Sequence, residues 1–184
     1  MEFQKTIKGQ ISTKGIGLHS GKLVSVNFKP SMPDTGVNFV RVDLPERPII
    51  KAHISKLVDL TKSPRRTTIG QDDAEVQTIE HFMAALAGLG VDNIIIEING
   101  DEMPGLDGSA ADFVDLLLRA GIENQHVPRK EFKVAEPIWI EEDNASLVIL
   151  PADDFTISYT LSYEHSALHS QYLTLSLSDG IFKT

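Results

Sequence analysis

The sequence has no cysteine among its 184 residues. It therefore has no disulfide framework, and it offers no thiolate as a nucleophile or as a metal ligand. Any metal ion would have to be held by histidine, aspartate or glutamate side chains. The hydrophobic fraction of 41% is ordinary for a globular protein, so we expect a packed core.

Positive charge is also scarce. The 17 lysine and arginine residues are outnumbered by 26 acidic residues, which gives a net charge of −9. Since nucleic-acid-binding proteins carry a basic surface, this balance argues against a nucleic-acid partner. Long apolar runs are missing too: nothing approaches the ~20 residues of a membrane helix, and the first residues do not resemble a secretory signal. We therefore expect a soluble, cytoplasmic protein without a transmembrane segment.

The first 70 residues have the alternating pattern of short β-strands. Val24, Val26 and Phe28 alternate with polar residues, which is the period of a half-buried strand. Further strands are predicted over residues 37–42, 49–54 and 67–69.

A helical pattern follows these strands. Its apolar stripe at positions i, i+3, i+4 and i+7 consists of Ile79, Phe82, Met83 and Leu86. Gly88 and Gly90 are placed to end this helix. The β-branched run at residues 94–96 predicts a strand that is covered on both faces.

A second helix is predicted to start at Ser109, a good N-cap residue, with Asp112 three residues later as in a capping box. It should end at Gly121 after burying one face, formed by Phe113, Leu116, Leu117 and Ala120. From Lys130 onward the chain returns to strands: residues 138–140 precede a turn at 142–144, residues 147–150 follow it, and alternating stretches lie at 155–161 and 173–177.

These patterns predict an α+β fold. The first unit is a two-layer helix-on-sheet domain over residues 1–126, and residues 127–184 are the strand-rich, incomplete first part of a second, similar domain. The polar segment 123–129, which contains Pro128, is the candidate boundary. No helices follow this boundary to cover the later strands, so we expect the second domain to be unfinished.

The dipeptide Glu80-His81 is the main candidate for chemistry. On a helical wheel Glu80 points sideways from the apolar stripe and His81 points nearly opposite to it. The face beyond His81 holds only small residues, so we expect the helix to be buried all round and this ionisable pair to meet another segment or a ligand. Neutral imidazole is a common zinc ligand and a carboxylate is a common general base. From these residues alone, a hydrogen-bonded interface pair remains the commoner arrangement.

The other candidates have simpler interpretations. His19 lies in a glycine-bracketed segment, residues 15–21, and its spacing favours an ordinary turn histidine. His165 and His169 have metal-ligand spacing only on a shared helix, which the strand pattern around them disfavours. The turn at residues 103–111 feeds a helix N-terminus, a place that can bind an anion but more often is only a cap. Arg65 and Arg66, which follow Pro64, could meet a phosphate, but two exposed arginines usually have no specific role. His53 and His126 have no clear context.

Three blocks together resemble the UDP-3-O-acyl-N-acetylglucosamine deacetylases, the zinc enzymes of lipid A synthesis in Gram-negative bacteria. The blocks are Gly15-Ile16-Gly17-Leu18-His19-Ser20-Gly21, residues 78–93 beginning Thr78-Ile79-Glu80-His81, and Asp107-Gly108-Ser109-Ala110-Ala111. They occur in the same order and at similar separations, and the resemblance weakens after about residue 125. It implies two similar α+β domains with the site between them.

The resemblance also implies an activity and roles for two residues. The activity is a zinc-dependent amidohydrolase reaction that removes the N-acetyl group of the UDP-sugar substrate. By the resemblance His81 is one of three protein ligands of Zn2+, and Glu80 is the general base. The family's two other ligands, in a His-Lys-x-x-Asp motif, and its later catalytic histidine have no match in this sequence. We expect them beyond Thr184, and we expect the 184 residues alone to be inactive.

Two further hypotheses remain open. The first is a non-catalytic α+β binding or interaction domain that keeps the scaffold without the chemistry, because no complete catalytic set is visible. The second, a phosphotransferase, is weaker, since no glycine-rich phosphate loop followed by lysine occurs. The acyl-chain preference and the oligomeric state are not encoded in any pattern that we recognise.

Overall fold

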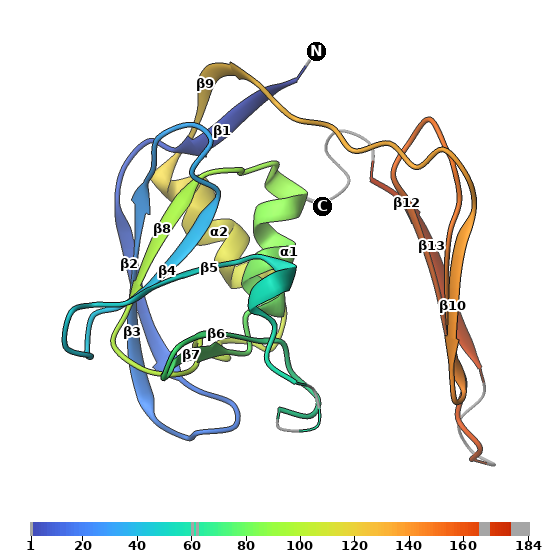
Figure 1. Ribbon diagram of the computed structural model, residues 1–184, viewed down its shortest axis with the longest axis horizontal. Helices are drawn as coiled ribbons and strands as arrows, with labels where there is room; N and C mark the ends of the chain where they lie inside the picture. The colour runs from blue at the N-terminus through green and yellow to red at the C-terminus, as the bar shows by residue number, and fades with distance from the viewer. Residues whose placement is uncertain (1, 60, 62, 166–169, 178–184) are drawn as a thin grey trace. The chain divides into compact units, whose positions relative to one another are not determined.

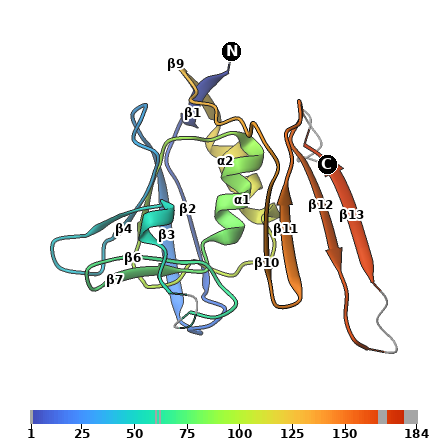
Figure 2. The ribbon, with the colours of Figure 1, turned by 45° about the vertical axis from the view of Figure 1, so that its right-hand side comes forward.

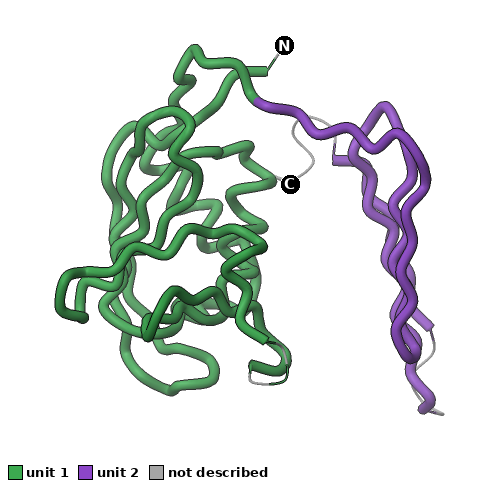
Figure 3. Tube along the Cα trace, viewed as in Figure 1, with its two compact units in different colours: residues 1–129 green, residues 130–184 purple. Residues whose placement is uncertain are grey.

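The computed structural model describes residues 2–59, 61, 63–165 and 170–177. The chain forms two compact units, residues 1–129 and residues 130–184 (Figure 3). The division follows Arg129, whereas the boundary predicted at residues 126 and 127 falls inside a strand. No helix in the described part of the chain is both long and apolar enough to span a membrane.

The first unit is built around a five-stranded sheet in the order β2-β3-β8-β4-β5. Its strands are β2 (Ile11–Ile16), β3 (Leu23–Pro30), β4 (Val37–Arg41), β5 (Ile49–Lys51) and β8 (Ile94–Ile98). Only β4 and β8 run parallel, and the other pairs are antiparallel. Two strand pairs flank this sheet: β1 (Phe3–Ile7) with β9 (Ile122–Pro128), and β6 (Thr68–Gln71) with β7 (Ala74–Gln77).

Both helices cover one face of the sheet, side by side (Figures 1 and 2). They are α1 (Glu80–Leu89) and α2 (Ala111–Ala120), and a short 3-10 turn, η1 (Ile54–Lys56), precedes them in the chain. Phenylalanines fill the layer between sheet and helices: Phe28 of β3 stacks on Phe82 of α1 at 4.8 Å between ring centroids, and Phe113 of α2 packs edge-on at 5.4 Å from Phe82. Such buried aromatic pairs fix the position of α1 on the sheet.

The second unit contains two antiparallel hairpins, β10 (Ile138–Glu142) with β11 (Ala145–Ile149) and β12 (Thr156–Leu161) with β13 (Gln171–Ser176). None of its described residues is buried, and large apolar side chains such as Trp139 and Phe155 are exposed. The predicted α+β class is confirmed, with both helices in the first unit and strands in each.

The structure corrects several predicted elements. Residues 94–96 belong to β8, where Ile94 and Ile96 are buried but Ile95 is only half-buried, because the helices cover a single face of the sheet. The polar segment 123–129, predicted as the domain boundary, holds most of β9, which pairs with β1, and the first unit ends at its last residue, Arg129. The strand predicted over residues 49–54 ends at Lys51, and His53 caps the 3-10 turn that follows.

Helix α2 also differs from the prediction. It starts at Ala111, and Ala110 is its N-cap without a side-chain hydrogen bond. Ser109 accepts a hydrogen bond from the Ala111 N–H at 3.0 Å, while its own N–H and hydroxyl donate to Asp107 at 2.9 and 2.8 Å. Asp107 therefore holds Ser109 in a turn, and the helix begins after it.

Candidate active site at the amino end of helix α1

Glu80 and His81 open helix α1, at the point where the chain leaves β7. Both side chains are half-buried. Phe82 of the same turn is fully buried against the sheet, and this packing sets the rotation of the helix. Ala84 and Ala87 are exposed, so α1 is not buried all round as the sequence predicted; one side of it faces outward.

The carboxylate of Glu80 is anchored to a neighbouring segment. Its Oε2 accepts a hydrogen bond from the Thr67 N–H at 3.0 Å. Thr67 comes just before β6, so this bond ties the first turn of α1 to the loop over residues 63–67. A carboxylate held by a backbone donor keeps a fixed orientation, which a general base requires.

Asp107 of the third sequence block interacts electrostatically with His81. The pKa of Asp107 is below its ordinary value, chiefly because the backbone N–H and the hydroxyl of Ser109 donate to it; the charge of His81 contributes in the same direction. The turn at residues 107–109 is therefore not only a helix cap. It also carries a carboxylate within electrostatic reach of the imidazole.

The turn that carries His19 reaches the same region through Glu102. The buried Glu102 carboxylate accepts hydrogen bonds from the N–H groups of His19 at 2.9 Å and Ser20 at 2.7 Å, and from the Thr78 hydroxyl at 2.9 Å. Burial alone would raise the pKa of Glu102, but hydrogen bonds from Ser20, His19 and Thr78 outweigh it and hold the pKa below its ordinary value.

Glu102 is a site residue that the sequence did not reveal, because no periodic pattern marks it. The one available signal was Gly17. A Cβ at Gly17 would collide with the Glu102 carboxylate and with the Ser20 hydroxyl. Glycine at this position therefore reports the close approach of another group.

Several candidates have structural roles instead. Arg66 donates to the Ser63 hydroxyl at 2.9 Å, and Arg65 is exposed with φ of 59°. His53 accepts from the Ser55 N–H in its capping role, and His126 packs edge-on against Phe3. His169 lies outside the described residues, so the metal-ligand arrangement of His165 and His169, which the sequence pattern disfavours, stays untested.

The end of the second sequence block also serves the fold. Asp92 accepts from the Lys5 N–H at 2.9 Å and pairs with Arg129 at 2.8 Å. The buried Asn93 amide donates to Gln4 at 2.8 Å and to Gln125 at 2.7 Å. These bonds join the start of β8 to β1 and β9, which closes the first unit.

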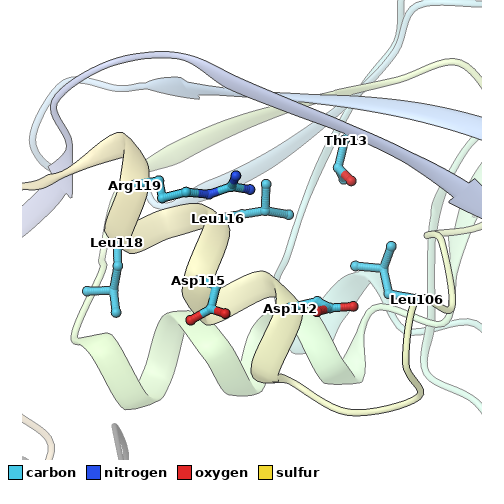
Figure 4. A pocket seen from close by; sticks show the side chains of 7 residues that line it. All are labelled: Thr13, Leu106, Asp112, Asp115, Leu116, Leu118 and Arg119. Atoms are coloured by element: carbon cyan, nitrogen blue, oxygen red, sulfur yellow. The ribbon is translucent and has the colours of Figure 1, made fainter.

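A cavity of about 630 Å3 lies beside α2 (Figure 4), and neither Glu80 nor His81 lines it. Its lining comes from α2, from β2 and from the turn before α2: Thr13, Leu106, Asp112, Asp115, Leu116, Leu118 and Arg119. Two carboxylates and one guanidinium give this cavity no excess of positive charge, so it is poorly suited to an anionic diphosphate.

The described residues do not form a metal site by themselves, because no group of three or more His, Asp or Glu side chains among them is arranged to hold an ion. The cluster at the start of α1 consists of the His81 imidazole and the neighbouring Glu80 carboxylate. A catalytic zinc site commonly has three protein ligands. This cluster therefore fits a part of such a site and not a complete one.

Comparison with known proteins decides the family. The family model described as LpxC, UDP-3-O-acyl N-acetylglycosamine deacetylase, matches residues 4–184. The chain belongs to this family. Among curated members, the UDP-3-O-acyl-N-acetylglucosamine deacetylase of Geobacter sp. (strain M21) is 40% identical over 182 residues, which are 99% of this chain and 59% of the relative.

Two other members of the deacetylase family show similar identity and coverage. The protein of the same name from Syntrophus aciditrophicus is 36% identical over 183 residues, covering all of this chain and 57% of the relative. The protein from Histophilus somni is 41% identical over 165 residues, or 90% of this chain and 53% of the relative. The chain thus spans between half and two thirds of the length of these deacetylases.

Proposed function

We propose that these 184 residues are the amino-terminal part of an enzyme that removes the N-acetyl group from UDP-3-O-acyl-N-acetylglucosamine, a hydrolysis in lipid A synthesis. The observation that carries the proposal is the cluster at the start of α1. Family membership and the names of the relatives support the substrate. The fixed Glu80 carboxylate and the adjacent imidazole support hydrolysis of an amide.

In this reaction Glu80 is the general base. Its carboxylate takes a proton from the attacking water as the water oxygen bonds to the acetamide carbonyl carbon. The C–N bond then breaks, acetate leaves, and the proton passes to the glucosamine nitrogen, which becomes a free amine. The bond from the Thr67 N–H holds one oxygen of Glu80 and so restricts the orientation of the carboxylate.

His81 would hold a zinc ion together with ligands outside the described residues. When bound, zinc supplies Lewis-acid polarisation of the carbonyl and activation of the nucleophile. Because one imidazole does not make a site of ordinary affinity, the 184 residues alone are expected to be inactive. The cytoplasmic location predicted from the sequence stays a prediction.

The test uses a polypeptide in which residues 1–184 are followed by the remaining segment of the Geobacter relative, here called the extended chain. We expect it to release acetate from the substrate, and we expect activity to vanish with a chelator and return with zinc. Glu80→Gln should lower kcat by at least about 100-fold, the usual scale for loss of a general base. Glu75→Gln, a half-buried carboxylate of β7, is the matched control and should retain activity.

Activity that persists both after chelation and in Glu80→Gln contradicts the proposed chemistry. A chain that binds the substrate without releasing acetate would favour the binding-domain alternative. Zinc content, measured by elemental analysis of the wild type and of His81→Ala, separates metal binding from catalysis.

A further inference from the structure

Thr78 has a strained backbone directly before the site. Its φ is 56°, and its side chain is β-branched and only 3% exposed. A left-handed conformation is unfavourable for a β-branched residue and persists only where surrounding contacts enforce it. Thr78 lies between the end of β7 and the start of α1, so its conformation sets the direction in which Glu80 and His81 leave the sheet.

The segment over residues 101–103 supplies those contacts. The Gln77 N–H donates to the Asp101 carbonyl at 2.9 Å, and the Met103 N–H donates to the Gln77 carbonyl at 3.0 Å. Between these two bonds, the Thr78 hydroxyl donates to Oε1 of Glu102 at 2.9 Å. The strained residue is thus held through both its backbone neighbour and its own side chain.

The same carboxylate holds the turn that carries His19. Oε1 of Glu102, which accepts from Thr78, also accepts from the His19 N–H at 2.9 Å, and Oε2 accepts from the Ser20 N–H at 2.7 Å. Two segments about 60 residues apart in sequence therefore share one oxygen atom. Gly17 leaves room for this arrangement because it has no side chain.

We infer that Glu102 is a positioning residue of the proposed deacetylation site. Its shared oxygen fixes the start of α1, with Glu80 and His81, relative to the turn that carries His19. A buried carboxylate suits this task because it only accepts hydrogen bonds and can take several donors at once. A neutral glutamine in its place would point N–H groups at the N–H donors. The inference rests on the proposed function of Glu80 and His81.

The first test needs no activity and uses the 184-residue chain. In Glu102→Gln, we expect amide hydrogen exchange at His19 and Ser20 to accelerate by about tenfold or more, because hydrogen bonds to a charged acceptor are lost. We expect the imidazole NMR resonances of His19 and His81 to shift together. Thr78→Val removes the hydroxyl at nearly constant volume and should shift the His81 resonances, whereas Thr78→Ser keeps the donor and should restore them.

Asn93→Ala is the matched control, since Asn93 is also buried and makes side-chain hydrogen bonds, but to β1 and β9. It should destabilise the fold without moving the His19 and His81 resonances. The inference is overturned if folded Glu102→Gln and Thr78→Val leave both histidines unchanged, or if Asn93→Ala moves them equally. Thr78→Val decides the matter should Glu102→Gln not fold.

The second test measures kcat and KM in the extended chain, normalised to folded protein. Glu102→Gln should lower kcat by about 100-fold, the scale expected when a catalytic group is displaced by about 1 Å, with zinc content unchanged. A purely structural role would reduce the folded fraction and leave the normalised kcat intact. If Glu80→Gln abolishes activity and Glu102→Gln does not change kcat, the positioning role of Glu102 is wrong but the proposed function stands. If Glu80→Gln is fully active, the proposed function itself is wrong.

Discussion

Gly17 is the smallest feature on which the site depends. Its missing side chain leaves the space that the Glu102 carboxylate and the Ser20 hydroxyl occupy. The backbone of Gly17 also accepts from the Gly21 N–H at 3.0 Å and donates to the Lys22 carbonyl at 2.9 Å, which closes the turn around His19. A methyl group at this position would push the turn away from Glu102.

We therefore expect Gly17→Ala to lower the free energy of unfolding by about 1–3 kcal/mol, the usual cost of overpacking. Urea denaturation followed by circular dichroism measures this change. Gly9→Ala is the control, because an added Cβ there would meet only the Ala120 carbonyl oxygen at 3.8 Å. It should change stability by less than about 0.5 kcal/mol. Equal effects of the two substitutions would show that the space at Gly17 is not restrictive.

At the scale of the elements, Arg41 links the main sheet to the β6–β7 hairpin. It ends β4, is only 7% exposed, and donates through Nη1 to the Glu75 carbonyl of β7 at 2.7 Å. Its Nε and Nη2 donate to both oxygens of Asp43 at 2.9 and 2.7 Å. This two-point pair orients the guanidinium so that Nη1 reaches the Glu75 carbonyl of β7.

The ion pair of Arg41 with Asp43 predicts that the stability of the fold depends on pH. The hydrogen bond from Arg41 is the main cause that holds the pKa of Asp43 below its ordinary value of 3.8. A carboxyl whose pKa is lower in the folded state stabilises the fold at any pH above its pKa in the unfolded chain. This stabilisation is lost as the pH falls through its pKa in the folded state. Asp43→Asn should therefore lower the free energy of unfolding by about 1–3 kcal/mol at pH 7. The difference in this free energy between wild type and variant should become smaller below pH 3.8.

Urea titrations of wild type and Asp43→Asn at a series of pH values measure this narrowing. Asp72→Asn is the control: Asp72 lies in the exposed β6–β7 turn with φ of 54°, a conformation that asparagine also tolerates. The free energy of unfolding of Asp72→Asn should differ from that of the wild type by less than about 0.5 kcal/mol at each pH. A cost of Asp43→Asn that does not vary with pH would contradict the assigned role of the ion pair.

At the scale of the whole molecule, the two units differ in how much they bury. The first unit holds the phenylalanine core and the Asn93 hydrogen bonds, whereas no described residue of the second unit is buried. We expect residues 1–129 alone to unfold cooperatively in urea with a midpoint close to that of the whole chain. Residues 130–184 alone should show no cooperative transition, because isolated hairpins are marginal in water.

Circular dichroism of the two separate pieces measures this difference. A cooperative transition in residues 130–184 would show that the hairpins form a core of their own. Loss of the helical signal in residues 1–129 would show that the first unit depends on the second.

The sequence predicted those parts of the fold that depend on local periodicity. The buried face of β3 follows from apolar residues two apart, such as Val24 and Val26. The buried face of α1 follows from apolar residues three or four apart, such as Phe82 and Leu86. It did not predict that polar segment 123–129 is a strand, since the partner that makes it one, β1, is more than 100 residues away. The role of Glu102 was missed for the same reason: its donors lie in two distant turns, and only tertiary packing brings them together.

The pairing of β1 with β9 has a topological consequence. Phe3 stands opposite Pro128, so the first unit begins and ends at one point of its surface. A domain with adjoining ends tolerates circular permutation and insertion into a host loop. A short peptide could join these ends, and new termini could open in the exposed loop at residues 45–47, which would leave every strand of the sheet and the start of α1 uninterrupted.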